Sequence, residues 1–168
     1  MPDLSPARQV TFPHTGPADR ARYARGVAHH YIFNLVGGDA SQATGLLRAR
    51  MWGVGTEEPH RDALAPGDLA LVYLAAPERK FIARAALASA VHDWTPPEKQ
   101  VYPGDSPGGV LLAHVEEWDP PVPMSTVLSQ IDRSAGARAD FEVGVVRITA
   151  DEYETALAVA AERPTSAG

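Results

Sequence analysis

The segments MWGV (residues 51–54), LAPGDLALVYL (residues 64–74) and FIARA (residues 81–85) decide the fold of this chain. The first places a tryptophan just after a short helical pattern, and the other two are apolar runs separated by turn residues. Pro66 fixes φ at the first position of a turn, and Gly67 permits a positive φ at the next. This order of elements favours a small barrel whose mouth is walled by aromatic side chains. Such a pocket suits a flat ligand, of which a nucleobase is the commonest.

The remaining pattern predicts one α+β domain, with five strands and about three short helices at their margins. A chain of 168 residues buries enough surface to need no covalent staple. The strands are expected at residues 29–36, 69–75, 81–91, 110–118 and 141–148, and the helices at residues 42–50, 125–131 and 152–162. Thr149 and Glu152 form a capping box for the last helix. Pro120 and Pro121 are expected to break the fourth strand.

The other segments are expected to be irregular. Residues 93–109 hold four prolines and three glycines, which predicts one long loop. Residues 133–140 are expected to be a mobile connection. Residues 1–28 are predicted to be a mostly disordered arm and residues 164–168 a flexible tail, which leaves residues 29–163 as the single folded domain.

The charge is distributed unevenly along the chain. A formal net charge of −6 argues against general electrostatic binding of nucleic acid. In the first 50 residues, however, six arginines outnumber three aspartates. Arginine forks onto phosphate and stacks on bases better than lysine does, although GC-rich coding would also favour it. The candidate phosphate contacts are Arg48, Arg50, Arg79 and Arg84, and a solvated surface is the alternative explanation for most of them.

Several chemistries find no support in the sequence. The chain has no cysteine, which removes disulfides, thiolate catalysis and Cys-ligated zinc, and fits a reducing cytoplasm. His29 and His30 would point to opposite faces of a strand, so they cannot readily share a metal ion. No Gly-x-Ser-x-Gly motif is present. No apolar run approaches 18 residues, and residues 1–28 lack the apolar core of a secretory signal. We therefore expect no metal, no cofactor and no membrane partner.

The order of these motifs resembles that of the EVE domain, a branch of the PUA-like superfamily that also includes YTH and ASCH domains. The resemblance runs from about Tyr31 to Ala158. It rests on an aromatic opening strand, the Trp-Gly-Val step at residues 52–54, the Pro-Gly-Asp turn that leads to Tyr73, and the FIARA strand. The closing VVRITADEY at residues 145–153 is similar to the Val-x-x-Thr-x-x-Glu-aromatic ending of the family.

The resemblance implies a PUA-like mixed β-barrel of about five to six strands with short helices at its margins. It also implies a non-catalytic domain that binds DNA or RNA and recognises a modified base, such as methylated or hydroxymethylated cytosine. One aromatic wall of the pocket would be Trp52, and the other would be Trp94 or Tyr102 from the long loop. The ligand-binding residues implied in this way are Asn34, Leu35, Trp52, Gly53, Val54, Tyr73, Trp94 and Tyr102. For the aromatic residues among them, packing in the core is the alternative.

Two other functions stay open. ASCH domains include amidohydrolases that act on modified nucleosides through Lys, Thr and Glu, and Lys80 would be the lysine here unless it is only a solvated turn residue. The second alternative is a protein-docking module of a restriction or defence system. In that case the acidic surface would bind a nuclease or another effector protein.

Overall fold

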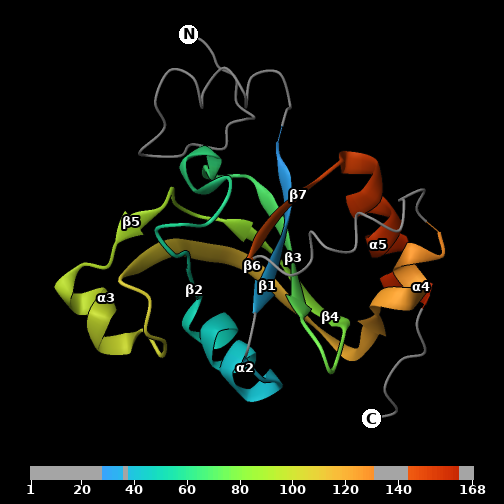
Figure 1. Cartoon of the computed structure of the whole chain (residues 1–168), viewed down its shortest axis with the longest axis horizontal. Helices are drawn as coiled ribbons and strands as arrows, with labels where there is room; N and C mark the ends of the chain where they lie inside the picture. Colours follow the sequence, from blue (N-terminus) through green and yellow to red (C-terminus); the bar gives the residue numbers. More distant parts are fainter. Residues whose placement is uncertain (1–27, 36–37, 131–143, 163–168) are drawn as a thin grey trace, which may run out of the picture.

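The computed structural model describes residues 28–35, 38–130 and 144–162, which form a curled mixed sheet with short helices at its margins (Figure 1). The strand order is β2-β6-β4-β3-β1-β7, and β5 pairs with β6 off this path. β1 and β3 run parallel, whereas the other pairs are antiparallel. The predicted α+β barrel is confirmed, and the short strands β2 and β5 bring the described strands to seven.

The elements follow one another closely along the chain. The strands are β1 His30–Leu35, β2 Met51–Gly53, β3 Leu69–Leu74, β4 Lys80–Leu87, β5 His92–Asp93, β6 Gly108–Pro123 and β7 Val145–Ile148. The helices are α2 Ala40–Ala49, the 3-10 turn η1 Arg61–Ala63, α3 Pro96–Val101, α4 Met124–Leu128 and α5 Ala150–Glu162. None of the helices described is long and apolar enough to cross a membrane.

The Pro-Gly-Asp turn before β3 forms as predicted, with Gly67 at a φ of 90°. Asp68, the third residue of the turn, is completely buried. Its two carboxylate oxygens accept hydrogen bonds at 3.0 Å from the backbone N–H groups of His29 and Ala65. Asp68 therefore ties the turn to the residue just before β1, which lies beside β3 in the sheet.

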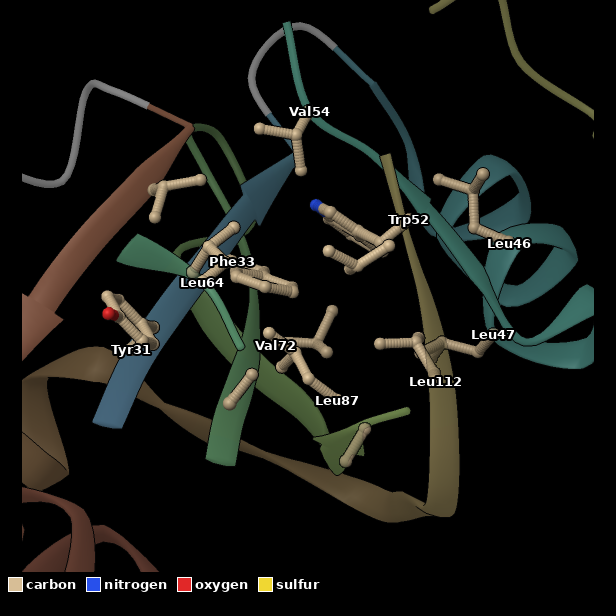
Figure 2. Packing of buried hydrophobic residues seen from close by; sticks show 14 of the residues in the cluster. Tyr31, Phe33, Leu46, Leu47, Trp52, Val54, Leu64, Val72, Leu87 and Leu112 are labelled. Atoms are coloured by element: carbon tan, nitrogen blue, oxygen red, sulfur yellow. The ribbon is translucent and has the colours of Figure 1, made fainter. Parts of the chain in front are cut away.

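The sheet buries apolar side chains on both faces because successive strand residues point in opposite directions. Phe33, Val72 and Leu87 belong to the first cluster, where they pack with Trp52 (Figure 2). The second cluster contains Ile32, Leu71 and other residues that pack with side chains of α4 and α5. Figure 1 shows α4 and α5 at the opposite end of the molecule from α3 and β5. The capping box of Thr149 and Glu152 opens α5 as predicted, with reciprocal hydrogen bonds of 2.8 and 3.0 Å.

The prediction of one long loop over residues 93–109 is wrong, because β5 and α3 lie within this region. Thr95 and Glu98 form a capping box in which the Thr95 N–H donates to Glu98 Oε1 at 2.9 Å and the Glu98 N–H donates to Thr95 Oγ1 at 3.4 Å. Pro96 and Pro97 occupy the first helical positions, where a missing N–H costs nothing. The Thr-Pro-Pro-Glu motif is therefore a helix start.

The predicted break at Pro120 and Pro121 is also wrong, since β6 continues to Pro123. The β4–β6 register shifts between Phe81 and Ala83, so the prolines fall at an irregularity in the ladder. A proline is tolerated there because its missing N–H removes no regular ladder bond. β4 ends at Leu87 rather than at residue 91. The expected arm over residues 1–28, apart from residue 28, the expected connection 133–140 and the expected tail 164–168 lie outside the described residues.

Candidate binding cavity

A cavity of about 230 Å³ lies where the end of β1, β2, α2 and the segment before β6 meet. Pockets that bury a drug-sized ligand measure about 300–1,000 Å³, so this one suits a smaller group such as a single ring system. Five of its lining residues are among those predicted from the sequence: Asn34, Leu35, Trp52, Gly53 and Tyr102. The other five are Leu46, Glu58, Ser106, Gly144 and Val145.

Trp52 belongs both to the cavity and to the core. It lies on β2, opposite Val110 of β6, and only 3% of its surface is exposed. Its ring lies nearly parallel to that of Phe33, with 5.9 Å between the ring centroids and 21° between the planes (Figure 2). Trp52 therefore packs in the core, as the alternative interpretation expected, and the same side chain also lines the cavity.

Tyr102, which follows α3 directly, is a more exposed wall of the cavity. Its hydroxyl lies over the Cα of Gly53, where a Cβ would overlap it and would come within 2.7 Å of the Ser106 Cβ. Burial raises the pKa of Tyr102 above its ordinary value of 10.0, although a hydrogen bond from the Ser106 backbone lowers it. The hydroxyl therefore stays protonated at neutral pH, and position 53 admits no side chain without displacing Tyr102.

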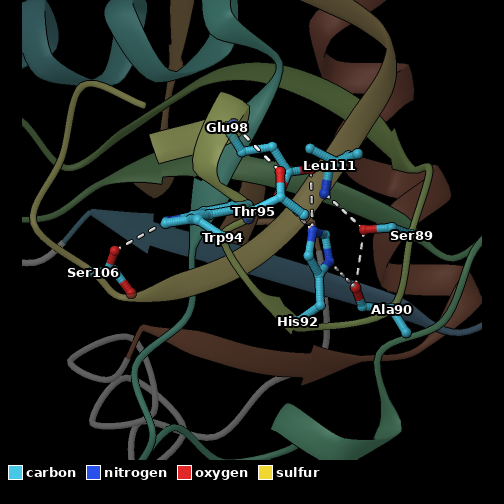
Figure 3. A network of polar contacts seen from close by, with 8 residues as sticks. All are labelled: Ser89, Ala90, His92, Trp94, Thr95, Glu98, Ser106 and Leu111. Carbon is cyan, nitrogen blue, oxygen red and sulfur yellow. Dashed lines mark hydrogen bonds and ion pairs between the residues drawn. The ribbon is translucent and has the colours of Figure 1, made fainter. Parts of the chain in front are cut away.

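Trp94 supports Tyr102 from outside the cavity lining. The two rings are 4.8 Å apart at an angle of 41°, and the Trp94 Nε1–H donates to the Ser106 carbonyl at 3.0 Å. Trp94 also makes a T-shaped contact with His92, with 5.6 Å between the ring centroids. Figure 3 shows Trp94 and its hydrogen bond to Ser106. Of the two residues predicted for the second aromatic wall, Tyr102 lines the cavity, and Trp94 packs against Tyr102.

Polar contacts anchor α3, and with it Tyr102, to the sheet (Figure 3). His92 Nε2 lies 3.0 Å from Glu98 Oε1, and His92 Nδ1 lies 3.1 Å from the Ala90 carbonyl. Ser89 Oγ accepts from the Leu111 N–H of β6 at 2.9 Å. Burial acts to raise the pKa of Glu98, but hydrogen bonds from the Thr95 backbone and His92 outweigh it and bring the pKa below its ordinary value of 4.5. Glu98 is therefore charged at neutral pH.

Glu58 is one of the five lining residues that the sequence analysis did not predict, and it is the one among them with an ionisable side chain. It follows β2 in a loop, and its Oε1 accepts a hydrogen bond of 3.0 Å from the N–H of Gly144, just before β7. The Gly144 carbonyl in turn accepts from the Asn34 N–H at 2.8 Å. In the sequence, Glu57 and Glu58 suggest at most a pair of metal ligands. No cluster of three or more potential ligands occurs in the part of the chain that the structure describes.

Three of the predicted ligand residues do not line the cavity. Trp94 lies behind Tyr102, and Val54 is buried in the first core cluster, with 1% of its surface exposed. Tyr73, expected at the pocket floor, lies in the second cluster on the other face of the sheet. Its hydroxyl donates to Met124 Sδ at 3.3 Å. The neighbouring Val72 faces the first cluster, so strand alternation directs Tyr73 away from the cavity.

The four candidate phosphate contacts do not gather at the cavity, since none of them lines it. Arg84 pairs with Glu116 at 2.9 Å, and Arg48 lies 4.0 Å from Glu117. Arg50 is the C-cap of α2, and Arg79 lies in the turn between β3 and β4. Lys80, the lysine of the amidohydrolase alternative, begins β4 and pairs with Pro123 at the far end of β6. None of the described lining residues is a lysine or a histidine.

Comparisons with known proteins identify the fold. No family model matches the chain, and no curated protein matches its sequence. Among solved structures, a hypothetical protein from Leishmania major matches with a TM-score of 0.59 and 16% identity, covering 82% of this chain and 97% of that one. Human THYN1, solved in complex with DNA containing 5-methylcytosine, matches with a TM-score of 0.55 and 12% identity, covering 82% of this chain and all of THYN1. A mutant form of an ASCH protein from Zymomonas mobilis matches with a TM-score of 0.51 and 9% identity, covering 77% of this chain and 95% of that protein.

These matches define a class by fold. The curled mixed sheet and its short marginal helices agree with the α+β, PUA-like barrel fold expected from the sequence. Within that class, the chain is similar to both THYN1 and the ASCH proteins, at identities that show the fold alone.

Proposed function

We propose that this chain is an EVE-type, PUA-like domain that binds nucleic acid and takes one modified base, such as methylated or hydroxymethylated cytosine, into the cavity. The observation that carries the proposal is the cavity of about 230 Å³, which has Trp52 and Tyr102 among its walls and polar groups beside them. An aromatic wall binds the face of a base, and polar groups at the rim can bind its edge.

The energies involved are compatible with this proposal. Stacking on an aromatic side chain contributes about 1–3 kcal/mol per base. Extraction of a base from a duplex costs a few kcal/mol, and less from a mismatch or a single strand. One or two aromatic contacts together with edge hydrogen bonds therefore offset the cost, and a single-stranded site is the less demanding target.

The neighbouring folds support the same function. THYN1 was solved with DNA that contains 5-methylcytosine, and its whole length matches 82% of this chain. Because an ASCH protein also matches, the amidohydrolase function is the second candidate. The cavity itself favours binding over catalysis, because the described lining offers Glu58 and Tyr102 but not the lysine that the alternative requires. We therefore propose a non-catalytic role.

Substitution of Tyr102 tests the proposal. Tyr102→Ala removes an aromatic wall and should weaken binding of a 5-methylcytosine oligonucleotide by about 5- to 150-fold, the equivalent of about 1–3 kcal/mol of stacking. Tyr102→Phe keeps the ring and should change the affinity by less than about threefold. The measurement is a titration of a labelled single-stranded oligonucleotide followed by fluorescence anisotropy, with thermal unfolding of each variant as the control for folding.

Tyr102 is a better probe than Trp52. Replacing a buried tryptophan by alanine costs about 3–5 kcal/mol of stability, so Trp52→Ala would confuse unfolding with loss of binding. If Tyr102→Ala folds and binds as tightly as the unaltered protein, the cavity is not the base site. If the unaltered protein binds none of a panel of DNA and RNA oligonucleotides carrying cytosine, methylcytosine, hydroxymethylcytosine or methyladenine, the proposed function is wrong.

A further inference from the structure

Glu58 brings a carboxylate to a cavity that is also lined by the aromatic rings of Trp52 and Tyr102. Its side chain is partly buried and comes from the loop between β2 and η1. The loop is bent by a hydrogen bond of 3.2 Å from the Glu58 N–H to the Gly55 carbonyl. Figure 1 shows β2 close to α2. Leu46 of α2 is another residue of the cavity lining. A carboxylate at this position affects which ligands the cavity accepts.

The carboxylate is held in place before any ligand binds. Its Oε1 accepts from the Gly144 N–H at 3.0 Å, and Gly144 is itself bonded through its carbonyl to the Asn34 N–H at 2.8 Å. A Cβ on Gly144 would overlap the Glu58 carboxylate and would lie 2.7 Å from its Cδ, so the carboxylate rests directly against the glycine backbone. These contacts, which reach the ends of β1 and β7, fix an acceptor group beside the aromatic walls.

An ionised carboxylate only accepts hydrogen bonds, and its two oxygens together offer about four acceptor sites. The Gly144 N–H uses one of them. A ligand that fills the cavity can use the others only if it presents a donor. Cytosine presents its N4 amino group as a donor, whereas thymine and uracil present an O4 acceptor at the equivalent position. Two facing acceptors repel each other, so a Glu58 carboxylate that faces this position favours an amino group there and disfavours an oxo group.

We propose that Glu58 determines base specificity in this cavity, by accepting a hydrogen bond from the exocyclic amino group of a cytosine-type base and rejecting its oxo counterparts. This inference rests on the proposed function and names the residue that selects the base within it. The cavity, at about 230 Å³, is large enough to hold one base. Discrimination then comes from the carboxylate, whereas the aromatic contacts contribute affinity without distinguishing amino from oxo groups.

The test compares two bases that differ in this group. 5-Methylcytosine and thymine carry the same methyl group but present an amino and an oxo group, respectively, to an edge-reading side chain. The unaltered protein should bind a single-stranded oligonucleotide containing one 5-methylcytosine about 5- to 150-fold more tightly than its thymine twin, the discrimination expected for a well-placed base contact of about 1–3 kcal/mol.

Glu58→Gln should abolish this preference. Glutamine keeps an oxygen that can accept from the Gly144 N–H, but its amide also offers two donors that can bind the thymine O4. The ratio of the two affinities should fall below about threefold or reverse. Glu57→Gln is the matched control, because it makes the same change of charge at an exposed neighbour that does not line the cavity, and it should keep the preference.

The outcomes separate the two proposals. If the unaltered protein binds both oligonucleotides equally well, or if Glu58→Gln folds and keeps the full preference, the role of Glu58 is overturned while base binding stands. If neither oligonucleotide binds at any concentration, the proposed function fails first. Loss of the preference in Glu58→Gln but not in Glu57→Gln supports the assignment.

Discussion

At the scale of the residue, the cavity depends on side chains that serve two purposes. Trp52 packs against Phe33 in the core and also lines the cavity, so its position is determined by the fold. Tyr102 packs against Trp94, and its hydroxyl fits against Gly53 because that residue has no side chain. Rigid aromatic groups of this kind bind with little loss of side-chain entropy, because their orientation is already set.

A substitution at Gly53 should disturb the cavity without disturbing the fold. In Gly53→Ala the new methyl group overlaps the Tyr102 hydroxyl and approaches the Ser106 Cβ, so the Tyr102 ring must move. We expect the affinity for a 5-methylcytosine oligonucleotide to fall about tenfold, within the range of one lost stacking contact. The measurement is the same anisotropy titration, with circular dichroism to check the fold.

The matched control for this prediction is Gly55→Ala. A Cβ at Gly55 would lie 3.8 Å from the Glu58 Cγ, which is an ordinary van der Waals contact. The affinity of Gly55→Ala for the same oligonucleotide should therefore stay within about twofold of that of the unaltered protein. Equal affinities for the two variants would show that the position of Tyr102 over Gly53 does not matter for binding.

At the scale of the element, the Pro-Gly-Asp turn connects strands that are distant in the sequence. Asp68 accepts from Ala65 within the turn and from His29, 39 residues away and just before β1. Since β1 pairs in parallel with β3, this carboxylate helps to set the register of the pair. A buried carboxylate with two backbone donors is stabilising only while both hydrogen bonds are made.

Removal of the Asp68 carboxylate should therefore be costly. In Asp68→Ala the N–H groups of His29 and Ala65 lose their acceptor, and we expect a loss of about 2–5 kcal/mol in the free energy of unfolding. Urea denaturation followed by circular dichroism measures it. Asp62→Ala is the control, because the Asp62 side chain is fully exposed and should change stability by less than about 0.5 kcal/mol. A similar small change in both variants would contradict the structural role of Asp68.

Elements defined by local signals were predicted well, and others were missed for specific reasons. The apolar run of β3, the turn at Gly67 and the capping box of α5 depend on residues close in the sequence, and all three formed as expected. α3 was missed although its Thr95–Glu98 capping box is equally local, because four prolines dominated the interpretation of that segment. The continuation of β6 through Pro120 depends on its pairing with β4, which no local pattern reveals.

At the scale of the whole molecule, charge limits how the proposed binding of nucleic acid can take place. The chain carries a formal net charge of −6, and none of the four candidate arginines lines the cavity. Two of those arginines, Arg48 and Arg84, already lie beside carboxylates. Affinity should therefore come from the base and its immediate surroundings more than from an extended phosphate track.

Salt dependence tests this expectation. Each phosphate contact to a single strand contributes a slope of about −0.7 in a plot of log K against log salt. With one or two such contacts, affinity should fall by less than about tenfold between about 50 and 200 mM salt, whereas a surface with about 6–10 contacts to a single strand would lose about 3 × 10² to 2 × 10⁴. The measurement is the oligonucleotide titration repeated at both salt concentrations and constant pH. A loss of a thousandfold would reveal a phosphate-binding surface elsewhere on the chain.

Local sequence patterns were enough to establish the α+β class, most strand positions and the aromatic residues near the cavity, because alternation, turn chemistry and capping act over a few residues. They could not show which of those aromatic groups share a site. Tyr73 is one residue from Val72 yet faces the opposite cluster, and Glu58 meets Gly144 across 86 residues. Such contacts arise only when the sheet curls and its register is set, so the direction of each side chain depends on partners that are distant in the sequence.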